Sequence, residues 1–261
     1  MVWIVFLAVS FLASVAGSIC GIGGGVIIKP VLDATGVMSV SAISFLSGCT
    51  VLSMSIISVG KKLRQKDNSM DLRIGSALAV GAAIGGVVGK ELFQYAYVIC
   101  SDGNRVGAIQ AGVLLVITVG TLIYTLRKAR IQTLKVNSLP AACVIGFVLG
   151  IMSSFLGIGG GPINLVVLHF FFSMETKPAA ACSLYVIMFS QLTSLFSTLI
   201  KGKVPDTSLI LLILMVGGGV AGGMVGSSIN KKISSEHVNK LFCFLMMIII
   251  GICAWNIKRF V

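Results

Sequence analysis

Two apolar stretches that are too long for a single membrane crossing limit what this chain can fold into. Residues 139–172 form 34 consecutive positions without Asp, Glu, Lys or Arg, and residues 2–32 carry only one such residue, Lys29. One helical crossing of a bilayer takes about 20 residues. Each stretch has a glycine cluster near its middle, which favours a broken helix or a re-entrant hairpin over one continuous helix.

The rest of the chain is also strongly apolar. Of the 261 residues, 56% are hydrophobic and 11% are charged, whereas soluble domains carry about 25% charged residues. The N-terminal stretch lacks a basic leading segment, so we expect a retained membrane segment rather than a signal peptide. Further stretches of crossing length span residues 40–59, 74–89 (extended by Leu92 and Phe93), 106–126, 179–200, 207–229 and 241–257. The sequence therefore predicts an all-α, multi-pass integral protein of the cell membrane.

Two glycine patterns occur twice, in the same order. The cluster Gly21–Gly25 reads G-I-G-G-G and returns as Gly157–Gly161. This recurrence predicts an internal duplication, with repeats at residues 1–131 and 139–261 and a basic connecting loop at 132–138. Each repeat would hold three or four transmembrane helices and open with the glycine-broken one. In the second pattern, Gly81, Gly85, Gly86 and Gly89 correspond to Gly218, Gly222, Gly223 and Gly226.

The basic residues do not decide whether these halves are parallel or inverted. If each long stretch crosses once, the halves are parallel; if each enters and returns, they are inverted. The nine basic residues of the first half lie inside in both cases. The parallel arrangement adds Lys201, Lys203, Lys258 and Arg259, and the inverted one adds Lys177, Lys231, Lys232 and Lys240. The positive-inside rule gives a tie, and we favour inverted repeats because the mid-stretch glycines suit the turn of a hairpin.

The two G-I-G-G-G clusters are the candidate binding site. Backbone N–H groups cannot stay unsatisfied in hydrocarbon, so a non-helical stretch must line a cavity or hold a ligand. Glycine permits positive φ and close approach of a ligand, and free N–H groups at a helix start attract anions. We expect an anion near the membrane midplane, where the two clusters meet. The candidate binding residues are Gly21, Gly23, Gly24, Gly25, Gly157, Gly159, Gly160, Gly161, Pro162, Asn164, Ser47, Ser183 and Gln191.

Other conspicuous residues have simpler interpretations. The second glycine pattern has the spacing of four that is typical of tightly packed membrane helices. We expect Lys29 near the interface with a snorkelling ammonium; the alternative is that it is a partner for the anion. We expect His169 at an interface as well. The seven cysteines include no C-x-x-C pair and are interpreted as apolar fillers. Cys20, beside the first cluster, is the candidate for contact with a sulfur substrate. We expect no cofactor, no metal and no catalytic residue.

At these residues the chain resembles the TauE/SafE family of sulfite exporters, within the wider group of sulfonate and organosulfur permeases. The resemblance is carried by Gly21–Gly25 with Pro30, by Gly157–Pro162 and by the segment 179–191, and it extends over essentially the whole chain. It implies transport of a small sulfur-containing or organic anion without ATP hydrolysis by the protein. Pro30 and Pro162 have no counterparts in the other half, so the two half-sites are not expected to be equivalent.

The function that we expect is secondary transport of sulfite, a sulfonate or a related sulfur oxyanion. Its partners would be the lipid bilayer, the anion and a coupling ion, either a proton or sodium; the direction of transport and the oligomeric state stay open. Alternatives are a passive anion channel, which would lack saturable, gradient-coupled flux, and a permease for a small carboxylate or other organic anion.

An embedded enzyme is disfavoured because the chain has no H-E-x-x-H, no G-x-S-x-G and no carboxylate near the centre of a span. The two costly helix breaks argue against a purely structural subunit. The net charge of +12 lies beside the spans, so no nucleic acid is expected.

Overall fold

The computed structural model describes residues 2–64, 71–100 and 103–260, and within them the chain is helical without a β-strand. Eight helices are long and apolar enough to cross a membrane, and two have 11 residues each. The multi-pass, all-α fold is therefore confirmed. The elements are α1 (Val2–Cys20), α2 (Gly25–Thr35), α3 (Val40–Arg64), α4 (Leu72–Cys100), α5 (Gly103–Arg127), η1 (Lys128–Arg130), α6 (Leu139–Leu156), α7 (Pro162–Phe172), α8 (Thr176–Ile200), α9 (Leu209–Lys232) and α10 (Ser235–Phe260).

Both overlong stretches are broken at their glycine clusters, as predicted. In the first stretch α1 ends before Gly21 and α2 begins at Gly25, and in the second α6 ends before Gly157 and α7 begins at Pro162. The backbone turns through positive φ at Gly21 (77°) and Gly157 (65°), a region that glycine enters without steric cost. Each half thus has the same order: a long helix, a glycine turn, an 11-residue helix and three long helices.

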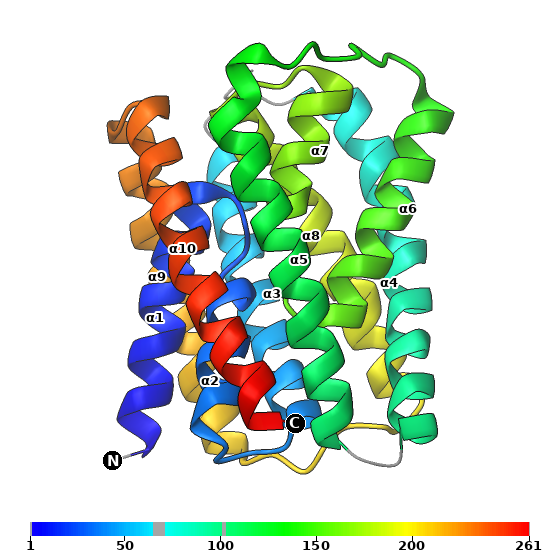
Figure 1. Cartoon of the computed structure of the whole chain (residues 1–261), viewed down its shortest axis with the longest axis vertical. Coiled ribbons are helices and arrows are strands. Elements are labelled where there is room, and N and C mark those ends of the chain that lie inside the picture. The colour runs from blue at the N-terminus through cyan, green and yellow to red at the C-terminus, as the bar shows by residue number, and fades with distance from the viewer. Residues whose placement is uncertain (1, 65–70, 101–102, 261) are drawn as a thin grey trace.

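The two broken helices run in opposite directions. In Figure 1, α1 starts at the end of the bundle that carries the N-terminus and α2 returns there, whereas α6 starts at the other end and α7 returns to that end. At the N-terminal end, the α10 residue Arg259 donates a hydrogen bond to the Ala34 carbonyl of α2. At the other end, Ser173 Oγ, just after α7, donates to Thr133 Oγ1 of the connecting loop at 2.6 Å. These directions are those of inverted repeats, whereas the homology of the halves stays a prediction.

The corresponding helices of the two halves pack in corresponding ways, each against helices of the other half. α4 packs on α6 while α9 packs on α1, and α4 packs on α8 while α9 packs on α3. The pairs α3–α8 and α5–α10 join the two halves. A Cβ on Gly85 or Gly222 would lie less than 3.0 Å from the carbonyl oxygen of Phe147 or Phe11, respectively. The second glycine pattern therefore brings helix backbones into contact, and its predicted packing role is confirmed.

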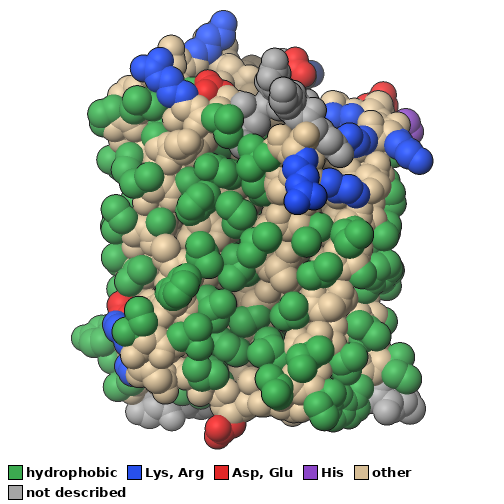
Figure 2. All heavy atoms as spheres, turned by 180° about the vertical axis from the view of Figure 1, so that it is seen from behind, with side chains coloured by type: hydrophobic (Ala, Val, Ile, Leu, Met, Phe, Trp, Pro, Cys, Tyr) green, Lys and Arg blue, Asp and Glu red, His purple; other side chains and the backbone are tan. Residues whose placement is uncertain are grey.

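The outer surface has an apolar belt and two unequal ends. Figure 2 shows hydrophobic side chains over the middle of the bundle and basic side chains gathered at one end. Among the described residues, that end, which holds the connecting loop, carries Lys61, Lys62, Arg64, Arg73, Arg127, Lys128, Arg130, Lys135, Lys177, Lys231, Lys232 and Lys240. The N-terminal end carries Arg105, Lys201, Lys203, Lys258 and Arg259. Lys29 and Lys90 belong to neither end because both are buried.

Candidate functional site

The two glycine breaks touch each other inside the bundle. A Cβ on Gly23 would lie 3.0 Å from the Gly159 carbonyl oxygen, and one on Gly25 would lie closer than that to the Ile158 carbonyl oxygen. Only glycine allows the two backbones to approach so closely. The structure therefore brings the two clusters together in space, as the sequence predicts.

At this crossing, two apolar side chains lie against the non-helical backbone of the breaks. The amides of Gly23 and Gly159 have no hydrogen-bond acceptor among the described residues. A Cβ on Gly159 would collide with Val51 of α3, and one on Gly160 would collide with Ile187 of α8. Free donors are thus present at the crossing, but Val51 and Ile187 cover it in this conformation.

Beside the second break lies a small cavity of about 20 Å³, which we call the Lys90 cavity. Its walls come from α3, α4, the end of α6 and α8. Ser44 lies near the start of α3 and Thr198 near the end of α8, so the cavity is displaced from the midplane towards the N-terminal end of the bundle. Its polar side chains are those of Ser44, Cys49, Lys90, Ser154, Gln191, Ser194 and Thr198.

Lys90 is the charged group of this cavity. Only 8% of the residue is exposed, and no carboxylate lies within ion-pair distance of it in the described part of the chain. The adjacent Glu91 pairs instead with Lys201 at the surface, and the Lys90 ammonium lies 5.2 Å from the centre of the Phe93 ring. A buried charge without a fixed partner is costly inside a membrane, which makes an anionic ligand the natural counter-charge.

The other polar groups of the cavity are suited to an anion rather than a cation. Its described lining includes no Asp or Glu. Ser44 Oγ is buried and has no hydrogen-bond partner among the described residues. Gln191 Nε2 donates to Ser153 Oγ at 3.3 Å, which leaves its second N–H available. Hydroxyl and amide donors therefore surround the ammonium.

The predicted site residues divide into three groups. Gly157 and Gln191 line the Lys90 cavity. Asn164 Nδ2 donates to Ser183 Oγ at 3.3 Å, while Asn164 Oδ1 and Ser47 Oγ are buried without a partner in the described structure. The remaining members form the breaks and their packing: Gly21, Gly23, Gly24, Gly25, Gly159, Gly160, Gly161 and Pro162.

One sequence interpretation is wrong. Lys29 does not snorkel, because it is 2% exposed and its Nζ lies 2.7 Å from Asp33 Oδ2. Its partner Asp33 is 7% exposed and lies in the last turn of α2, away from the centre of a span. The apolar stretch was taken to end at Leu32, but α2 continues through Asp33 to Thr35, and the i,i+4 ion pair is what allows both charges into the interior.

Lys90 and its hydroxyl neighbours were missed by sequence reasoning. The signal that could have found Lys90 was its position between Gly89 and the apolar pair Leu92–Phe93, inside a stretch of crossing length. By contrast, Cys20 lines none of the cavities; its thiol faces the Val238 carbonyl oxygen at 3.9 Å. Nothing in this geometry singles it out for substrate contact.

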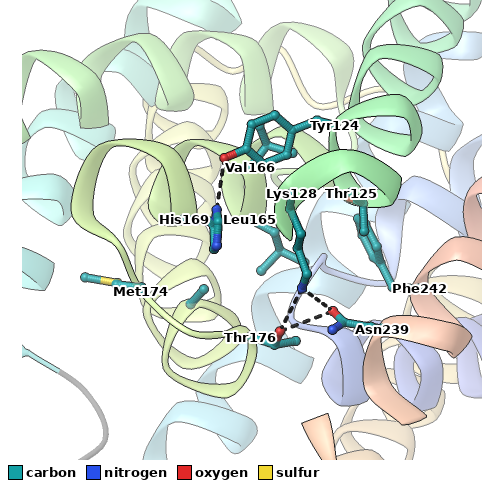
Figure 3. Close-up of a pocket in the computed structure, with 11 residues that line it drawn as sticks. Tyr124, Thr125, Lys128, Leu165, Val166, His169, Met174, Thr176, Asn239 and Phe242 are labelled. Atoms are coloured by element: carbon teal, nitrogen blue, oxygen red, sulfur yellow. Dashed lines mark hydrogen bonds between the residues drawn. The ribbon is translucent and has the colours of Figure 1, made fainter. Parts of the chain in front are cut away.

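A second cavity, of about 40 Å³, opens at the end of the bundle that holds the connecting loop (Figure 3). Lys128 reaches across it to Asn239 Oδ1 at 3.0 Å and Thr176 Oγ1 at 3.3 Å. His169 Nδ1 lies 2.9 Å from the Tyr124 hydroxyl on the opposite wall. Burial lowers the pKa of the Lys128 ammonium, and the nearby thiol of Cys243 partly opposes this. We call this cavity, whose lining is mostly apolar, the Lys128 vestibule.

Comparison with known proteins identifies the class and then the family. A family model described as "Sulfite exporter TauE/SafE" matches residues 6–252. Similar proteins include the "Probable membrane transporter protein YunE" of Bacillus subtilis (strain 168), which is 22% identical over 95% of this chain and 96% of its own length. Another is the "Probable membrane transporter protein MJ0441" of Methanocaldococcus jannaschii, 23% identical over 89% of this chain and 88% of its own length. No solved structure matches the chain.

The apolar belt, the broken helices and these relatives define a multi-pass membrane transporter. The chain belongs to the sulfite exporter TauE/SafE family.

Proposed function

We propose that the chain is a secondary transporter of a small sulfur oxyanion, such as sulfite or a sulfonate, and that it binds this anion in the Lys90 cavity. The observation that carries the proposal is the buried Lys90 ammonium, which has no carboxylate partner among the described residues. An oxyanion offers several acceptor oxygens. Lysine offers three donors as a point charge, and the surrounding hydroxyls can orient the remaining oxygens.

The broken helices supply the moving part of the proposed mechanism. Val51 and Ile187 occupy corresponding places on α3 and α8 and cover the crossing of the two breaks. Movement of one half against the other would withdraw these side chains, expose the free glycine amides to the anion, and open a path to the Lys128 vestibule. Inverted repeats give such a protein two related conformations that face opposite sides.

The end with twelve described basic residues would be cytoplasmic by the positive-inside rule.

A binding measurement tests the proposal. In Lys90→Gln the cavity keeps a donor but loses its charge, and sulfite affinity measured by calorimetry on purified protein should fall about 10- to 100-fold. Lys231→Gln, an exposed lysine at the other end of the bundle, is the matched control and should bind as the wild type does. Equal sulfite affinity in folded Lys90→Gln and wild-type protein would refute the assignment of the site.

Competition and flux then separate the alternatives. Thiosulfate, methanesulfonate and acetate as competitors distinguish a sulfur oxyanion site from a carboxylate site. Uptake of labelled sulfite into proteoliposomes should saturate with concentration in a transporter, whereas a linear, non-saturating flux would indicate a channel.

A further inference from the structure

A third cavity, lined by α2, α5, α10 and the end of α6, collects oxygen atoms that lack partners. Its volume is about 10 Å³, room for one small ion or one water, and Lys29, Asp33, Gln110 and Asn256 line it. Asp33 Oδ1, Gln110 Oε1 and Asn256 Oδ1 are each buried and have no hydrogen-bond partner among the described residues. Gln110 is 3% and Asn256 1% exposed. Three unpaired acceptors in one buried cavity are an exception to the usual pairing of buried polar groups.

Hydrogen bonds to the backbone fix how the two amides are turned. Gln110 Nε2 donates to the Phe155 carbonyl at 2.6 Å, and Asn256 Nδ2 donates to the Pro30 carbonyl at 2.8 Å. Each bond fixes the orientation of its amide, and it leaves the carbonyl oxygen free together with one N–H of the NH₂ group. Asp33 Oδ2 is taken by Lys29, which leaves Oδ1 free. The cavity therefore offers three free acceptor oxygens, one of them from a carboxylate, whereas the described lining of the Lys90 cavity has no carboxylate.

We infer that this cavity binds a small monovalent cation, a sodium ion or a proton, which is taken up together with the anion. The inference rests on the proposed function for the coupling, although the cation site itself does not require it. Carboxylate and amide oxygens are the ligands that hard cations prefer. A divalent ion fits less well because the single carboxylate is already paired with Lys29. The other titratable group in its lining is the Cys253 thiol. Arg259 lines the neighbouring cavity that Asp33 also lines, and it is hydrogen-bonded to carbonyls at the end of α2.

Charge balance gives a reason for coupling the cation to the anion. The buried ionic groups Lys29, Asp33 and Lys90 sum to one positive charge at rest. A dianion such as sulfite in the Lys90 cavity reverses this to one negative charge, and one monovalent cation restores neutrality. Each ion therefore makes the entry of the other less costly in a medium of low dielectric constant.

One short segment separates the two cavities and can carry this coupling. Ser154 and Gly157 line the Lys90 cavity, whereas Leu156 and Ile158 line the cation cavity. The carbonyl between them, that of Phe155, is held by Gln110. A ligand that draws Gln110 Oε1 towards itself would thus shift the wall of the anion cavity. By linkage, the cation must raise anion affinity by the same factor by which the anion raises cation affinity.

Binding to purified protein, at constant ionic strength, tests the inference. Thermal unfolding and sulfite affinity are measured in sodium, potassium and choline chloride, and across pH in choline chloride. If sodium is the ligand, sodium alone raises the melting temperature and tightens sulfite binding several-fold over choline. If a proton is the ligand, sodium has no effect and sulfite binding is instead accompanied by proton uptake from weakly buffered solution.

Variants separate a ligand role from a folding role. Gln110→Met removes one oxygen while filling its space, and it should abolish the cation effect on sulfite affinity while sulfite still binds. Gln94→Met is the matched control, because the Gln94 side chain accepts a hydrogen bond from Lys203 at an exposed position. This variant should keep the effect of the cation on sulfite affinity. Sulfite affinity that is independent of sodium and without proton uptake in wild-type protein overturns the inference. Sodium stabilisation without any sulfite binding would instead leave the cation site standing and refute the proposed anion function.

Discussion

Loss of Asp33 alone should destabilise the protein strongly through the buried ammonium that remains. Lys29 Nζ lies 2.7 Å from Asp33 Oδ2, and the two side chains are almost fully buried. Asp33→Asn keeps the shape of the side chain but removes its charge. Lys29 must then stay charged without a counter-ion or lose its proton, and either outcome costs free energy in the folded state.

The size of the effect follows from what is left behind. Breaking a buried ion pair by removal of one partner costs on the order of 3–5 kcal/mol, whereas replacing both partners by apolar residues is often neutral or stabilising. The double variant Lys29→Met/Asp33→Leu should therefore recover most of the stability that Asp33→Asn loses. Glu236→Gln breaks the fully exposed pair Glu236–Lys240, and it should cause no measurable change because water and salt screen such pairs.

The assay is denaturant unfolding in mixed micelles, followed by circular dichroism of the helices. The account predicts a clearly lower midpoint for Asp33→Asn and a midpoint near that of the wild type for both other variants. An unchanged midpoint for Asp33→Asn would show that Lys29 has another partner or is exposed to water. Our assignment of a buried pair would then be wrong.

Three further predictions concern the glycines and the direction of the helices. Gly160→Ala adds a Cβ against Ile187 at a backbone φ of 112°, so anion affinity should fall about 10-fold or more, while Gly120→Ala, which meets open space, should not change it. Gly85→Leu should reduce the yield of folded protein, measured by size-exclusion chromatography, because α4 and α6 touch through backbone atoms there; a normal yield with altered substrate preference would contradict a packing role. Single cysteines at positions 39 and 173 should be labelled by impermeant reagents from opposite sides of the membrane, and labelling from one side would contradict the inverted arrangement.

The features that the sequence predicted are those that depend on neighbours along the chain. A glycine cluster in the middle of an uncharged stretch breaks a membrane helix because glycine readily adopts the positive φ of a turn. The backbone groups that the break leaves unpaired must then lie inside the protein, away from lipid. The turns at Gly21 and Gly157 follow from this rule. Spacing of four along α4 likewise predicted the close packing of Gly85.

The features that were missed depend on residues that are far apart in sequence. Lys90 is recognisable as part of a site only because Ser44 of α3 and Gln191 of α8 line the same cavity. Asp33 looked like the end of a span because its partner Lys29 was taken to be at the interface. The packing of α2 against α10, and the cavity that both share with α5, show that the pair is internal. Asn256 and Gln110 line this cavity with unpaired carbonyl oxygens.

The position of a bound substrate analogue tests the central claim most directly. Selenite has the shape and charge of sulfite, and its selenium atom can be located by anomalous X-ray scattering in crystals soaked at low concentration. We expect a selenium peak beside Ser44 and Gln191 that is absent in Lys90→Gln, and it should lie one Se–O bond beyond the hydrogen-bond distance from Lys90 Nζ, because an oxygen of the anion accepts the bond. A peak confined to the Lys128 vestibule, or one that persists at the same place in Lys90→Gln, would contradict it.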